Sequence, residues 1–93
     1  MMITIDSRVV AEADLLSTDL DGETVMMDVE SGRYYALNDV GSRIWRDLAA
    51  PVEVEALCRR LEREYDATPE TIRAGVLRLL NRMLEKRLIR VVA

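Results

Sequence analysis

The hydrophobic pattern of the chain changes near its middle from a period of two to a helical period. Arg33–Leu37 follows the period of two, which predicts a strand with Tyr35 and Leu37 on one face. Asn38 can accept a hydrogen bond from a free backbone N–H of the following turn, so a helix should begin here. Gly41 weakens a helix interior, and we therefore expect this turn to approach a neighbouring element closely.

Two further strands are predicted ahead of this one. Residues 16–20 and 23–29 flank Asp21-Gly22, a pair that is typical of two-residue hairpin turns. A second turn leads into Arg33–Leu37, so the three strands should form an antiparallel meander whose third strand is an edge. Residues 3–13 show no clear period, and we expect them to be only an extended lead-in.

Two longer helices should follow the first. Residues 54–65 carry apolar side chains at helical spacing. Thr68 as cap and Pro69 at the first position predict the start of a third helix, which should reach Lys86. Its apolar arc spans about 160°, wider than one packing contact needs. Residues 88–92 predict a short terminal strand.

These elements predict an α+β fold, in which a three-stranded antiparallel sheet packs on a three-helix bundle that resembles a winged helix-turn-helix. The chain has 93 residues, which is room for a single core, so we expect residues 1–93 to form one domain. Because Phe is absent, that core must be built mainly from Leu, Val, Ile and Met.

Composition argues against several classes of protein. The chain has no apolar run of membrane-spanning length and no signal peptide, so we expect a cytoplasmic protein without membrane contact. Cys58 is the single cysteine and lies on an apolar stripe, which favours burial over reactivity. With no His and no Gly-rich phosphate loop, the sequence predicts no enzyme, no cofactor and no metal. Carboxylate pairs such as Asp19 and Asp21 should be solvated charge.

Charge is distributed unevenly along the chain. Residues 1–32 hold eight acidic residues and one basic residue, whereas residues 69–93 hold six basic residues and two acidic ones. A basic third helix can lie in a DNA major groove, which makes a winged-helix DNA-binding regulator one alternative function. A net charge of −4 and a pI near 4.8 argue against it, so we expect no nucleic-acid partner.

The edge strand offers a different kind of site. An extended peptide can add to Arg33–Leu37 through main-chain hydrogen bonds and place alternate side chains in the cleft beside the third helix. The wide apolar arc of that helix would supply the other wall. A plain core role for Tyr35 and Leu37 is equally consistent with the sequence, and we expect Trp45 to pack in the core.

Residues 34–48 read Tyr-Tyr-Ala-Leu-Asn-Asp-Val-Gly-Ser-Arg-Ile-Trp-Arg-Asp-Leu and follow a Glu-Ser-Gly turn. This arrangement resembles the family of PQQ-synthesis protein D, whose members are also called RiPP recognition elements. Its specific part is Tyr-x-Leu-Asn-x-x-Gly-x-x-Ile-Trp, and the similarity extends from about residue 15 to residue 91. Arg87 departs from relatives that often have Gly before the last strand.

The resemblance implies a non-catalytic adaptor that binds the leader segment of a ribosomally synthesised precursor peptide and presents it to modifying enzymes. The chain looks most like the stand-alone proteins of lasso-peptide clusters, which work with a separate leader peptidase. A PQQ-type peptide chaperone for a radical-SAM enzyme is another alternative. We expect a monomer that binds the leader by strand addition. The candidate peptide-binding residues are Arg33, Tyr34, Tyr35, Ala36, Leu37, Arg73, Leu77, Arg78, Leu80 and Leu84, with Arg82 as a further partner for acidic leader residues.

Overall fold

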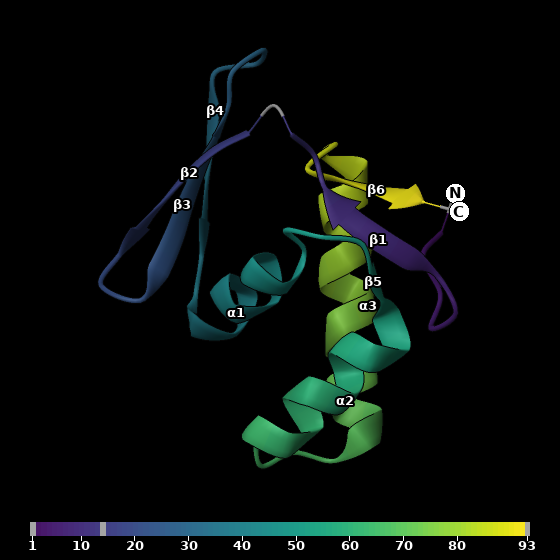
Figure 1. Cartoon of the computed structure of the whole chain (residues 1–93). Coiled ribbons are helices and arrows are strands. Elements are labelled where there is room, and N and C mark those ends of the chain that lie inside the picture. The colour runs from purple at the N-terminus through teal and green to yellow at the C-terminus, as the bar shows by residue number, and fades with distance from the viewer. Residues whose placement is uncertain (1, 14, 93) are drawn as a thin grey trace.

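The computed structural model describes residues 2–13 and 15–92. Within them the chain forms three helices and two three-stranded antiparallel sheets, which is the predicted α+β class (Figure 1). In chain order the elements are β1 (Arg8–Ala11), β2 (Leu15–Leu20), β3 (Glu23–Asp28), β4 (Arg33–Leu37), α1 (Asp39–Asp47), β5 (Val52–Glu53), α2 (Val54–Glu64), α3 (Pro69–Glu85) and β6 (Ile89–Val92).

The sheet β2-β3-β4 is the predicted meander. Asp21 and Gly22 both take positive φ, 51° and 87°, as a tight two-residue hairpin turn requires. β2 begins one residue earlier and β3 ends one residue earlier than predicted, while β4 has the predicted bounds. Because β3 pairs with both neighbours, β4 is an edge strand of this sheet, as expected.

The sheet β5-β1-β6 was not predicted. The expectation that residues 3–13 are only a lead-in is wrong for β1, which lies at the centre of this sheet. Val9 is fully buried and stands opposite Val52 and Val91. Two adjacent buried valines give β1 no alternation, so its sequence carries no strand signal. The terminal strand was predicted correctly, and Arg87 before it takes a φ of 60°.

α1 and α3 begin where their caps predict. Asn38 Oδ1 accepts a hydrogen bond from Gly41 N at 2.9 Å, and Thr68 Oγ1 accepts one from Thr71 N at 3.2 Å. Pro51 precedes β5, which pairs with β1 before α2 begins at Val54. No helix in the described ranges is long and apolar enough to span a bilayer.

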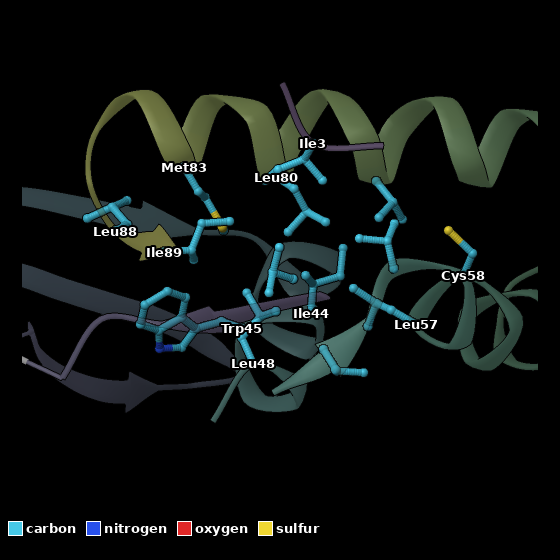
Figure 2. Packing of buried hydrophobic residues seen from close by; sticks show 14 of the residues in the cluster. Ile3, Ile44, Trp45, Leu48, Leu57, Cys58, Leu80, Met83, Leu88 and Ile89 are labelled. Atoms are coloured by element: carbon cyan, nitrogen blue, oxygen red, sulfur yellow. The ribbon is translucent and has the colours of Figure 1, made fainter. Parts of the chain in front are cut away.

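One hydrophobic cluster joins both sheets and all three helices. Ile44 and Trp45 of α1 and Leu48, which follows it, pack with Leu80 and Met83 of α3 (Figure 2). The prediction that Trp45 belongs to the core is confirmed, since its side chain is buried in this cluster.

The N-terminal segment is held to α3 by one asparagine. Asn81 Oδ1 accepts a hydrogen bond from Ile3 N at 2.7 Å, and Asn81 Nδ2 donates to Ile3 O at 3.3 Å. These bonds satisfy both backbone groups of a residue that is itself buried against α3.

A buried hydroxyl connects α1 to the meander. Ser42 Oγ accepts a hydrogen bond from Thr24 N of β3 at 2.8 Å and donates one to Leu37 O of β4 at 3.1 Å. The close approach expected at Gly41 is present, because a Cβ there would lie 3.3 Å from Leu37 Cβ. α1 therefore fixes where β4 ends.

We predict that Ser42→Ala lowers the free energy of unfolding by between about 1 and 3 kcal/mol, because it leaves the buried Thr24 N–H without an acceptor. Urea denaturation monitored by circular dichroism measures the change. Ser17→Ala, at an exposed position of β2, is the matched control and should stay within about 0.5 kcal/mol of the wild type. An unchanged midpoint for Ser42→Ala would show that this hydroxyl does not support the sheet.

Cys58 lies in the core, where burial raises the pKa of its thiol. We predict that a disulfide reagent modifies the folded protein at least about 100-fold more slowly than the urea-unfolded chain. Rapid labelling of the folded protein would contradict the burial of Cys58.

The raised pKa of the Cys58 thiol also predicts a pH dependence of stability. Above the unfolded thiol pKa of about 8.5, the unfolded state loses this proton before the folded state does, so the free energy of unfolding should fall as pH rises. The difference in free energy of unfolding between the wild type and Cys58→Ala should therefore narrow between pH 8 and pH 10.

Candidate functional site

A cavity of about 630 Å³ opens where the end of β4 and the start of α1 face the first half of α3. We call it the β4–α3 groove. Its volume lies within the range of ligand pockets, and its lining is mostly apolar. The apolar residues and glycines that line it are Ala36, Leu37, Val40, Gly41, Ile44, Leu61, Ala67, Ile72, Gly75, Val76 and Leu79.

The floor and the walls of the groove come from different side chains. Ile44, Leu61 and Val76 are buried and form its floor, while Leu37 and Leu79 are half-buried and form its walls. A wall that is half-buried in the free protein keeps apolar surface in contact with water. Burial of that surface by a ligand would release about 25 cal/mol per Å².

Gly75 opens the groove on the helix side. A Cβ added to this residue would meet no atom within 4 Å, so the missing side chain leaves free space rather than a tight contact. A glycine in a helix interior is destabilising by roughly 0.5–1 kcal/mol relative to alanine. This residue therefore weakens α3 while widening the cavity that α3 borders.

The C-terminal end of β4 borders the groove. Tyr35 is half-buried and shares its face with Leu37, whereas Tyr34 is 71% exposed on the opposite face. Lys86 Nζ lies 5.7 Å from the centre of the Tyr35 ring, which places the C-terminal end of α3 beside the middle of β4. Since Leu37 borders the cavity with the first half of α3, β4 and α3 run in opposite directions.

None of the three leucines predicted for the helix wall lines the cavity. Leu80 is fully buried in the core and cannot line an open groove. Leu77 and Leu84 are partly buried on the flank of α3 that includes Asn81, which binds Ile3. The wide apolar arc of α3 thus packs on the N-terminal segment with one flank and borders the groove with the other, and periodicity does not distinguish these flanks.

The predicted basic residues also divide between the two flanks of α3. Arg73 lies near Cys58, whose thiol pKa it acts to lower, and therefore belongs to the α2 side. Arg78 and Arg82 are exposed and follow Gly75 and Leu79 at helical spacing, which places them beside the groove. Lys86 continues this row and was not included in the sequence prediction.

Ion pairs hold α1 against α2 behind the groove. Arg43 of α1 donates a hydrogen bond to Glu64 of α2, which raises the pKa of Arg43, and a guanidinium nitrogen of Arg60 in α2 lies 3.6 Å from Asp47 Oδ1 in α1. Tyr65 and Asp66, which follow directly, line the cavity. No group of three or more His, Cys, Asp or Glu residues within 2–13 and 15–92 is placed to hold a metal ion.

Sequence reasoning located the strand and missed most of the helix side. Ile72, Gly75 and Leu79 line the groove, together with Tyr65 from the end of α2. The available signal was Gly75, because a glycine inside a strongly capped helix usually has a packing or binding reason.

A family model and a solved structure match this chain. No curated protein matches the chain. A solved structure of TbiB1 in complex with the TbiA(beta) leader peptide is similar, with a TM-score of 0.83 and 26% sequence identity over 90% of this chain and 98% of that chain. Residues 23–89 match the family model described as coenzyme PQQ synthesis protein D (PqqD). Because this match spans more than half of the chain, the protein belongs to the PqqD family, whose members include RiPP recognition elements.

Proposed function

We propose that this protein is a non-catalytic adaptor that binds the leader segment of a ribosomally synthesised precursor peptide. The observation that carries the proposal is the free edge of β4, whose last two residues, Ala36 and Leu37, line a largely apolar cavity. The similar TbiB1 structure holds a leader peptide, which supports a peptide as the ligand of this fold.

The leader would add to β4 as a further strand. Its backbone would pair with the free N–H and C=O groups of Arg33–Leu37, which provides affinity without fixing sequence. Alternate side chains would then point toward α1 and α3. One of them would enter the cavity between Leu37 and Leu79, where Gly75 leaves space. The intervening side chains of the leader would point to the opposite face of the sheet, where Tyr34 is exposed.

The delivery step is the second part of the proposal. In a lasso-peptide pathway the partner would be a separate leader peptidase that supplies the catalytic groups, and in a PQQ-type pathway it would be a radical-SAM enzyme. We favour the peptidase because Asn-Asp-Val-Gly at residues 38–41 and the Glu-Ser-Gly turn before β4 look most like those of the lasso-peptide adaptors. We further propose that the protein acts as a monomer in the cytoplasm.

We predict that Gly75→Phe weakens leader binding about tenfold or more while the protein stays folded. The ring would occupy the cavity, so the apolar anchor of the peptide, worth about 1.5–3 kcal/mol, would lose its site. Fluorescence anisotropy with the labelled leader of a precursor encoded beside this gene measures the dissociation constant, and circular dichroism checks the fold.

Ala74→Phe is the matched control for this substitution. Ala74 is the preceding residue of α3 and is exposed outside the cavity lining, so this variant should bind the leader like the wild type. Equal affinities of Gly75→Phe and wild type would show that the peptide does not use the groove.

We also predict that the protein alone leaves the mass of the precursor unchanged but speeds its cleavage by the peptidase. Tethering can raise the effective strength of a second encounter by about 10²–10⁴ without new contacts at the reacting bond. Mass spectrometry of timed reactions measures both effects. Cleavage by this protein alone, or no acceleration of a peptidase that processes the leader poorly by itself, would contradict the adaptor role.

A further inference from the structure

A basic row follows the groove side of α3. Arg78, Arg82 and Lys86 are exposed and lie four residues apart, so they occupy successive turns beside Gly75 and Leu79. In the described part of the chain none of the three takes part in an ion pair, although five other arginines do. Their charges are therefore available to a ligand in the groove.

The row lies over one end of the groove only. At one end, Lys86 stands over Tyr35 at the middle of β4. At the other end, the cavity is bordered by the first half of α3 and by Asp66. Arg33 at the start of β4 stands opposite Asp28 of β3, and no ion pair joins the two among the described residues. The positive charge at the Lys86 end thus comes from the row on α3 together with Arg33, and the other end carries an acidic residue.

The spacing of the row matches that of an extended peptide. Residues four apart on a helix are separated by about 6.0 Å along its axis. Alternate residues of a strand are separated by about 6.6–6.8 Å. A peptide that lies along α3 therefore presents every second side chain to a successive turn of the helix.

We infer that the groove selects leaders that carry an apolar anchor followed, at two-residue intervals, by acidic side chains. The anchor enters the cavity beside Gly75, with Arg78 at its rim. The next two groove-facing side chains meet Arg82 and Lys86. This inference rests on the proposed leader binding and adds to it the charge pattern of the ligand and the specificity role of Lys86.

The negative net charge of the protein does not oppose this selection. At physiological ionic strength the screening length is about 8 Å, so a bound carboxylate senses the row beside it far more than distant acidic residues. Each exposed pair should contribute modestly, about two- to fivefold in affinity. Selectivity then arises from the sum over the row.

A display selection tests the inference without knowledge of the precursor. A random peptide library is selected against the wild type and against Arg78→Gln/Arg82→Gln/Lys86→Gln. The matched control is Arg46→Gln/Arg59→Gln/Arg63→Gln, which removes the same charge from exposed positions outside the groove lining. All substitutions are at exposed sites, and circular dichroism verifies the fold of each protein.

We expect wild type and control to enrich peptides with Asp or Glu two and four positions from an apolar anchor. The groove variant should keep the anchor and lose the acidic preference, and a selected peptide should bind it about tenfold or more weakly. Enriched peptides without acidic preference, or an equal loss in the control, would overturn the charge inference while peptide binding stands. Failure of the wild type to enrich any peptide would overturn the proposed function, and the inference with it.

Discussion

The buried hydroxyl of Ser42 is the contact on which the position of β4 depends. A strand that recruits a peptide must be held firmly on one side and left unpaired on the other. β3 provides the ladder on the held side, and Ser42 adds bonds from the first turn of α1 to Thr24 and Leu37. Because Gly41 lets this turn approach Leu37, the end of β4 and the floor residue Ile44 are fixed together.

α3 serves two purposes because its apolar arc is wider than one contact requires. Leu80 and Met83 fill the core, and Asn81 on a neighbouring flank binds the backbone of Ile3. The opposite flank, with Gly75 and Leu79, is left half-covered and borders the cavity. A helix anchored by the core on one side can thus keep its other side rigid and open, which lowers the entropic penalty of binding an extended ligand.

Local signals predicted the fold well where a few neighbouring residues determine the structure. Asp21-Gly22 fixed a hairpin, and Asn38 and Thr68 marked helix starts that the structure confirms. β1 was missed because its burial depends on β5 and β6, which are distant in sequence. For a similar reason, the helix wall was predicted with Leu77, Leu80 and Leu84, whereas Leu79 lines the cavity. Periodicity shows which residues are apolar on a helix, but only the packing partners decide which of them face a cavity.

Residue-resolved hydrogen exchange of the backbone amides, with and without a bound leader peptide, tests peptide addition at β4 most directly. Strand addition would slow exchange at alternate amides of Arg33–Leu37, those that point away from β3, while the amides of β2 at the other edge of the sheet keep their rates. Slower exchange along β2 with unchanged rates in β4 would contradict the assignment of the binding edge.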